Sequence, residues 1–232
     1  MHGTTAVVTG ATSGIGRAVA TAFAEAGASV AICGRDATAV GELVNDLEAL
    51  GDGEVTGLRA DVRDEFDVER LVETASRTGP AGIDVVVANA GVFHGTPGKA
   101  SIAETSYTAF DEEFRTNVRG AFATFKESLP HLNEGARLLL PTGSVARDAK
   151  PGLGGYAPSK AGAEAVVRQF AADTEYAAGC VDPGKVETDL SGPGGRAPED
   201  VAAMFVWAAT ECDADDLDGA VVDLKAWKTA TR

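Results

Sequence analysis

The sequence lacks the features that define several other classes of protein. It has no apolar run near the roughly 18 to 20 residues that a membrane span requires, and no basic segment leads into an apolar stretch near its start. We therefore expect no membrane partner and no secretory signal, which favours a cytoplasmic protein. Its only cysteines, Cys33, Cys180 and Cys212, do not have metal-ligand spacing. We interpret them as small buried thiols and expect no metal site.

Basic residues are also scarce. The chain has 20 Lys and Arg against 35 Asp and Glu, a net charge of −15. Such a charge repels phosphate backbones, so nucleic acid is not an expected partner. The segment 211–218 carries five acids and no base. This composition favours a halophilic protein, whose acidic surface is screened by salt, but an ordinary acidic protein remains the alternative.

Short apolar runs alternate with helix-like stretches along the whole chain. Alternation of this kind predicts right-handed βαβ units and therefore an α/β, doubly wound Rossmann fold, with about seven parallel strands and helices on both faces. We expect one domain over residues 1–232. Residues 190–198, rich in Gly and Pro, are predicted to be the most mobile loop. The expected strands are 4–9, 29–33, 55–60, 83–88, 137–141, 177–181 and 220–224, and the expected helices are 14–27, 38–50, 65–77, 110–129, 155–172 and 198–209.

A glycine-rich turn joins the first predicted strand to the first helix. Its glycines are Gly10, Gly14 and Gly16, in the spacing G-x-x-x-G-x-G. Glycines let backbone amides approach an anion, and the positive end of the helix dipole faces the same point. The turn is thus predicted to cradle phosphates, although a merely tight turn would share this pattern.

The end of the second strand bears on the choice of dinucleotide. An acid at this place binds the ribose 2′-hydroxyl, whereas an arginine favours a 2′-phosphate. Here Gly34 is followed by Arg35, and Asp36 is interpreted as the N-cap of the next helix. The sequence therefore favours NADP(H) over NAD(H).

Tyr156 and Lys160 are candidates for proton transfer. They lie four residues apart at the start of a predicted helix, so they share one face. A nearby ammonium is expected to lower the pKa of the phenol, which could then donate a proton to a carbonyl oxygen or take one from an alcohol. This spacing also arises by chance, so the interpretation depends on the surrounding motifs.

Those motifs occur in order along nearly the whole chain, which resembles the short-chain dehydrogenase/reductase family. After the glycine motif, Thr9 to Gly16, come Asp61-Val62, Asn89-Ala90-Gly91, Asn117, Ser144, the Tyr156/Lys160 pair, Pro183-Gly184 and Thr188. The resemblance implies a homodimer or homotetramer that acts on a small carbonyl or alcohol. It also implies cofactor contacts from Gly10, Thr12, Ser13, Gly14, Ile15, Gly16, Arg35, Asp61, Val62, Asn89, Ala90, Gly91, Tyr156, Lys160, Pro183, Gly184, Val186 and Thr188.

The same resemblance implies a catalytic set of four residues. Nicotinamide would pass hydride to the carbonyl carbon while Tyr156 protonates the oxygen. Lys160 would lower the pKa of Tyr156 and hold the ribose, and Ser144 would orient the substrate oxygen. Asn117 would anchor a water that relays protons to Lys160.

Some features depart from the family pattern, and alternatives stay open. Ala88 replaces an asparagine, and the separation of Ser144 from Tyr156 is one position shorter than usual. Ser144 could be a turn hydroxyl, and His94 is interpreted as a surface loop residue. A catalytically silent nucleotide-sensing or scaffold protein on the same fold is the main alternative function. A methyltransferase and a sugar-nucleotide epimerase are disfavoured by Arg35 and by the lack of a substrate domain, respectively.

Overall fold

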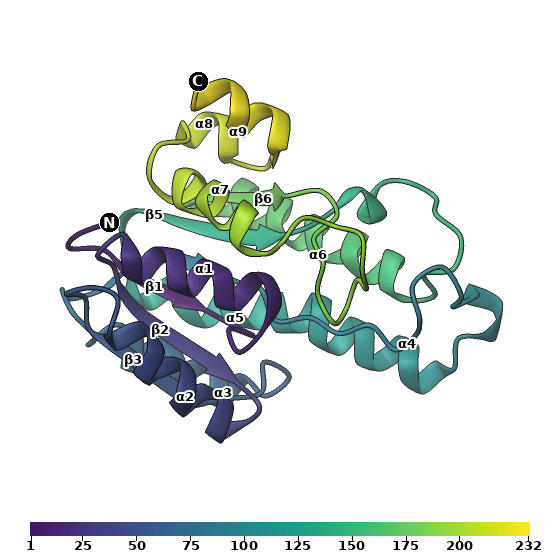
Figure 1. Ribbon diagram of the computed structural model, residues 1–232, viewed down its shortest axis with the longest axis horizontal. Coiled ribbons are helices and arrows are strands. Elements are labelled where there is room, and N and C mark those ends of the chain that lie inside the picture. Colours follow the sequence, from purple (N-terminus) through teal and green to yellow (C-terminus); the bar gives the residue numbers. More distant parts are fainter.

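The computed structural model describes residues 1–232 and is built around one parallel sheet. The seven strands lie in the order β3-β2-β1-β4-β5-β6-β7, and every neighbouring pair is parallel (Figure 1). This order confirms the predicted doubly wound fold, and the strand order reverses between β1 and β4. The strand bounds are Thr5–Val8 (β1), Ser29–Gly34 (β2), Val55–Arg59 (β3), Ile83–Val87 (β4), Leu132–Pro141 (β5), Ala177–Asp182 (β6) and Val221–Asp223 (β7).

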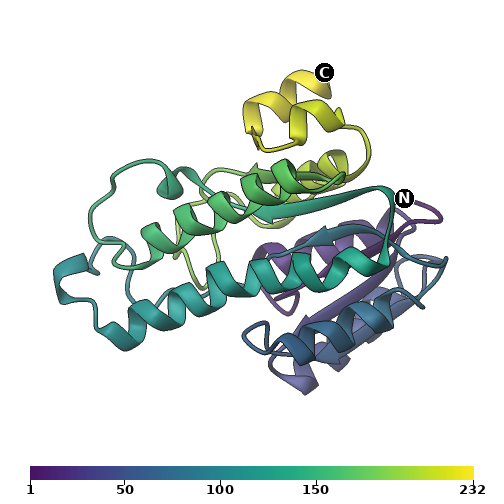
Figure 2. The same cartoon turned by 180° about the vertical axis from the view of Figure 1, so that it is seen from behind.

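Helices cover both faces of this sheet. Because side chains alternate along a strand, Ala6 and Val8 of β1 pack into one apolar cluster and Val7 into the other. The first cluster lies beneath α1 (Gly14–Glu25), α2 (Ala37–Glu48) and α7 (Glu199–Thr210). The second lies beneath α3 (Glu65–Ala75), α5 (Gly120–Ser128) and α6 (Tyr156–Asp173). Figure 2 shows α5 and α6 side by side on this second face.

The helix predicted over 110–129 is divided into three parts. It begins earlier, as α4 (Tyr107–Glu113), widens into a π-helix, η2 (Phe114–Arg119), and continues as α5. The helical run is uninterrupted from Tyr107 to Ser128, which confirms the long helix, but apolar periodicity does not distinguish a wide turn from an ordinary one and the π-turn was not predicted. π-Turns inside α-helices are frequent at functional sites, and this one contains Asn117.

The C-terminal part is more helical than predicted. A short helix, α8 (Ala214–Leu217), precedes β7, and a second one, α9 (Leu224–Ala230), follows it. The Asp223 side chain caps α9 by accepting from the backbone N–H groups of Lys225 and Ala226, at 2.9 and 2.8 Å. Trp227 packs partly buried against the first apolar cluster. The remaining short helices are η1 (Ile102–Glu104), η3 (Leu129–His131) and η4 (Ser144–Ala146).

Two expectations from composition concern the thiols and the membrane. Cys33, Cys180 and Cys212 are all free and buried, which confirms their interpretation as packing residues. None of the helices combines the length and the apolar character needed to cross a membrane.

Candidate active site

A cleft of about 1270 Å³ opens at the carboxyl ends of the strands, where ligands bind in open α/β sheets. Loops that follow β1, β2, β3, β4, β5 and β6 line it. Of the predicted site residues, Gly16, Asn117 and Pro183 do not line this cleft. The cleft does bring together Gly10, Thr12, Ser13, Gly14, Ile15, Arg35, Asp61, Val62, Asn89, Ala90, Gly91, Ser144, Tyr156, Lys160, Gly184, Val186 and Thr188.

The glycine-rich turn fits a phosphate group. Gly10 has a φ of +62°, which favours glycine, and a Cβ on Gly16 would lie 2.4 Å from the carbonyl oxygen of Gly10. Asn89, which follows the neighbouring strand β4, holds this turn in place. Its Nδ2 donates to the carbonyl oxygens of Thr9 and Gly10 at 2.9 and 3.0 Å. The Ser13 side chain does not cap α1, and the first turn of α1 has no acid. The N-terminal amides of α1 are thus left for an anion.

The end of β2 has the character predicted for the adenosine half of a dinucleotide. Asp36 is engaged as the N-cap of α2, since its Oδ1 accepts from the backbone N–H groups of Thr38 and Ala39 at 2.8 and 3.2 Å. Its exposed neighbour Arg35 lines the cleft. Arg63, a lining residue that sequence reasoning missed, donates to Asp61 at 2.6 to 3.0 Å. These hydrogen bonds hold the pKa of Asp61 below its usual value.

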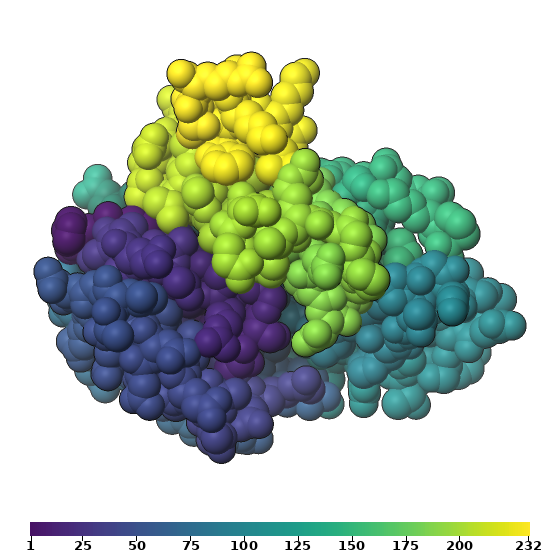
Figure 3. Space-filling view, viewed as in Figure 1, coloured from purple at the N-terminus to yellow at the C-terminus, as the bar shows by residue number.

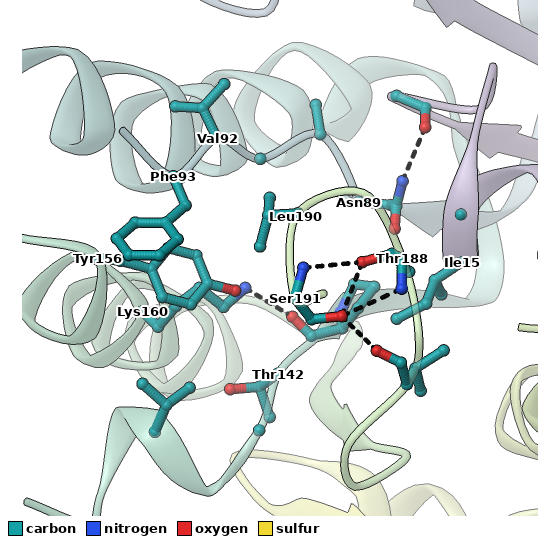
Figure 4. Close-up of a pocket in the computed structure, with 18 of the residues that line it drawn as sticks. Ile15, Asn89, Val92, Phe93, Thr142, Tyr156, Lys160, Thr188, Leu190 and Ser191 are labelled. Atoms are coloured by element: carbon teal, nitrogen blue, oxygen red, sulfur yellow. Dashed lines mark hydrogen bonds between the residues drawn. The ribbon is translucent and has the colours of Figure 1, made fainter. Parts of the chain in front are cut away.

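The segment 187–196, which follows β6, folds back on itself beside the glycine-rich turn. Its ends are paired, because the backbone N–H of Glu187 donates to the carbonyl of Arg196 at 2.8 Å. Ser191, another missed residue, lies 3.0 Å from the Thr188 hydroxyl (Figure 4). In the space-filling view this yellow-green segment projects between the purple N-terminal part and the teal part of the chain (Figure 3). The mobility predicted for residues 190–198 stays a prediction.

Tyr156 starts α6 and lies in the cleft against Phe93, with ring centroids 5.2 Å apart (Figure 4). The pKa of Tyr156 is shifted in the opposite direction from the one expected from the sequence. Burial, together with the charge of Glu113, raises the pKa of Tyr156 to about 12. The lowering of this pKa that was expected from Lys160 is not found in the chain by itself, because burial dominates and the charge of Glu113 adds to it.

Lys160 is hydrogen-bonded to the end of β5. Its Nζ donates to the carbonyl oxygen of Pro141, at the end of β5, over 2.8 Å (Figure 4). Burial lowers the pKa of Lys160. This hydrogen bond positions the ammonium on the floor of the cleft, one helical turn beyond Tyr156.

Ser144 follows β5 and opens η4. Its hydroxyl accepts a short hydrogen bond from Lys150 Nζ, a contact that sequence reasoning missed. Lys150 lies in the loop between η4 and α6, and it also approaches Asp148 at 3.7 Å. A second cation thus lines the part of the cleft where a substrate oxygen would meet Ser144.

Asn117 lies buried beneath the cleft. Its Oδ1 accepts from the N–H of Val92 at 2.8 Å, and its Nδ2 donates to the Val92 carbonyl at 2.9 Å and to Ser159 Oγ at 2.8 Å. Both amide protons are therefore used within the protein, and the side chain ties the loop after β4 to α6. The proton-relaying water expected at Asn117 stays a prediction.

Comparison with known proteins agrees with this geometry. The family model described as short chain dehydrogenase matches residues 4–197. An NADPH-dependent aldehyde reductase-like protein of Arabidopsis thaliana is 35% identical over 206 residues, which cover 82% of this chain and 75% of that protein. A short chain dehydrogenase from Burkholderia cenocepacia, solved in complex with NADP, has a TM-score of 0.85 at 26% identity and 97% coverage of each chain. An alcohol dehydrogenase from the archaeon Thermococcus sibiricus, complexed with 5-hydroxy-NADP, has a TM-score of 0.83 at 29% identity and 95% coverage of each chain. The chain therefore belongs to the short-chain dehydrogenase family.

Proposed function

We propose that this chain is an NADP(H)-preferring oxidoreductase that interconverts a carbonyl compound and its alcohol. The observation that carries the proposal is a single cleft that runs from the uncapped N-terminus of α1 to the phenol of Tyr156. A nicotinamide dinucleotide bound in this cleft would supply or accept the hydride. The phosphates would lie against the amides of Gly14 and Ile15, which line the cleft.

Three residues would handle the substrate oxygen and its proton. Tyr156 Oη donates the proton in reduction and accepts it in oxidation. The Ser144 hydroxyl orients the oxygen, which requires Lys150 either to move aside or to share the oxygen. Lys160 provides a fixed positive charge beneath the reacting atoms, where charge develops.

The preference for NADP(H) rests on Arg35. Its guanidinium is the cation that follows β2, and the neighbouring carboxylate of Asp36 is committed to capping α2. A 2′-phosphate would therefore meet the positive charge of Arg35, while the carboxylate of Asp61 is paired with Arg63. The NADPH-dependent aldehyde reductase-like protein of Arabidopsis and the Burkholderia short chain dehydrogenase in complex with NADP support the same preference.

The test has two stages. The purified protein is titrated with NADPH and with NADH while cofactor fluorescence is followed, and the better cofactor is then supplied with aldehydes, ketones, sugars and 3-oxoacyl thioesters. We expect tighter NADPH binding and oxidation of NADPH by at least one carbonyl class. Binding without turnover on the whole panel would favour the catalytically silent alternative, and no binding of either cofactor would overturn the proposal.

Two further expectations belong to the proposal. A homodimer or homotetramer is expected, and light scattering on the eluting protein checks it. A cytoplasmic location is checked by fractionating the source cells. The substrate class within the carbonyl panel is left to the second stage of the test.

A further inference from the structure

Glu113, at the end of α4, is a buried carboxylate that the proposed reaction does not use. Only 1% of the residue is exposed. One oxygen, Oε1, accepts from the backbone N–H of His94 at 2.8 Å, and the other, Oε2, has no hydrogen-bond partner. Glutamate is almost never fully buried unless it is paired, so this position calls for an explanation.

The unpartnered oxygen lies against the start of α6. A Cβ placed on Gly155 would be only 2.5 Å from Glu113 Oε2, so the absence of a side chain there admits the carboxylate. Gly155 immediately precedes Tyr156, and the Glu113 charge is therefore placed beside the first turn that carries the phenol.

Glu113 also works together with Asn117, four residues further along the chain. Asn117 holds both backbone groups of Val92, and Glu113 holds the N–H of His94. Phe93 lies between these two attachment points, and its ring contacts the ring of Tyr156. Segment 92–94 is thus clamped at both ends against the side chain that is proposed to transfer the proton.

We propose that Glu113 is a positioning residue that clamps segment 92–94 against Tyr156 and places a negative charge beside the first turn of α6. The inference rests on the proposed function for its catalytic meaning. The effect on the phenol itself does not require turnover, because it belongs to the folded chain.

The other charged groups around Tyr156 each face a partner of their own. Lys160, on α6, is turned to the Pro141 carbonyl. Lys150, in the loop before α6, is bound to Ser144. The His94 imidazole, in the loop after β4, faces Glu112 of α4, with Nε2 and Oε2 3.1 Å apart. Glu113 is the one charged neighbour that raises the pKa of Tyr156, after burial itself.

The pKa of Glu113 is also raised, chiefly by burial. A carboxyl is nevertheless ionised at the alkaline pH where a phenol titrates. Removal of its charge is therefore expected to lower the pKa of Tyr156. The native charge makes Tyr156 a weaker acid in the chain by itself, so it moves the pKa of the phenol away from the operating pH that general acid catalysis favours.

The test replaces Glu113 by Gln, which keeps an oxygen for the His94 N–H and removes the charge. Tyrosinate formation is followed by near-ultraviolet absorbance in the cofactor-free protein, and the same titration of Tyr156→Phe identifies the contribution of Tyr156. Circular dichroism on each sample defines the pH range over which the protein stays folded. We expect Glu113→Gln to move the Tyr156 transition down by about one pH unit. The matched control is Glu112→Gln, which loses an exposed charge from the adjacent position and should leave the transition in place.

A second variant separates the two roles. Glu113→Met removes the clamp as well as the charge, so it should lower the transition and also increase the KM for the carbonyl substrate. Glu113→Gln should shift the pH profile of turnover with little change in KM. A Tyr156 transition that is the same in the wild type and Glu113→Gln overturns the inference. Absence of turnover in every variant, with the transition shifted, would instead count against the proposed function alone.

Discussion

Lys160 donates from its Nζ to the carbonyl oxygen of Pro141, 2.8 Å away, while Tyr156 lies one turn earlier on the same helix. The lysine is therefore attached to the end of β5, and the phenol is packed against Phe93 of the loop after β4. Each member of the pair is positioned by a different strand end, and the cleft is the place where these strand ends meet. The chemistry of the pair thus depends on the sheet as much as on the helix they share.

Replacement of Tyr156 by Phe should abolish most turnover and leave cofactor binding intact. The phenylalanine ring keeps the contact with Phe93 but has no proton to give, and general acid catalysis contributes about 10² to 10⁴ in rate. Steady-state kinetics and NADPH titration measure the two effects. Tyr176→Phe, outside the cleft, is the matched control and should behave as wild type. Undiminished turnover in Tyr156→Phe would refute the assignment.

Replacement of Arg35 by Leu should weaken binding of NADPH and leave NADH nearly unaffected. The guanidinium is expected to meet the 2′-phosphate, which NADH lacks, and loss of such a contact corresponds to about tenfold in affinity or more. Parallel fluorescence titrations with the two cofactors provide the measurement. Arg17→Leu removes an equally exposed arginine that is paired with Asp46 at 2.8 Å and does not line the cleft. Equal loss for both cofactors in Arg35→Leu would contradict the assigned preference.

Replacement of Arg147 by Met should destabilise the fold. Arg147 pairs with Asp182 and approaches Glu164 at 3.7 Å, and the side chains of these acids are 11% and 2% exposed. Stranding buried carboxylates costs about 3 kcal/mol, which urea unfolding would detect. Arg168→Met is the control, since Arg168 reaches Glu164 only at 3.9 Å and is 55% exposed. Equal stability of both variants would show that Arg147 is dispensable to this cluster.

The three thiols should be unreactive in the native protein. Burial raises the pKa of Cys33 and of Cys180 to about 12 and also raises that of Cys212. The thiolate is the reactive form, so a raised pKa leaves little of it at neutral pH. Titration with a chromogenic disulfide reagent should detect three thiols after unfolding and almost none before. Rapid reaction of a thiol in the folded chain would contradict its buried placement.

Stability should rise with salt if the acidic surface is an adaptation to high salt. Screening relieves repulsion among like charges, so thermal melting in increasing KCl should show a higher Tm. Part of the acidic segment 211–218 has structural roles, since Asp213 caps α8 and Asp218 accepts from the N–H of Ala178 at 3.0 Å. A Tm that does not change up to molar KCl would leave the ordinary acidic protein as the correct interpretation.

The fold and the gathering of the motifs could be predicted from the sequence. Strand–helix alternation determines a parallel sheet, and the carboxyl ends of its strands share one edge. Residues such as Gly10, Asn89 and Tyr156 follow different strands and therefore meet in one cleft. No three-dimensional information was needed for that part.

The contacts that tune the site could not be predicted in the same way. Glu113 and Lys150 lie in no motif, and their effects depend on how α4 and the loop before α6 turn toward the cleft. The Tyr156 pKa was mispredicted for this reason, because spacing identifies Lys160 as a neighbour but does not reveal the burial or the carboxylate. The helix α9 was missed because its capping residue, Asp223, also ends the last strand.

The wide turn of η2 constrains the number of residues in the continuous helix formed by α4, η2 and α5. Each residue rotates the rest of a helix by about 100°. The carboxylate of Glu113, just before that turn, and the amide of Asn117, within it, both hold segment 92–94. Deletion of one residue between Glu113 and Asn117 would rotate one of these side chains away from segment 92–94 and leave the other in contact with it. The helix should therefore tolerate changes of side chain on its outer surface far better than any insertion or deletion, even one that restores regular α-helical geometry.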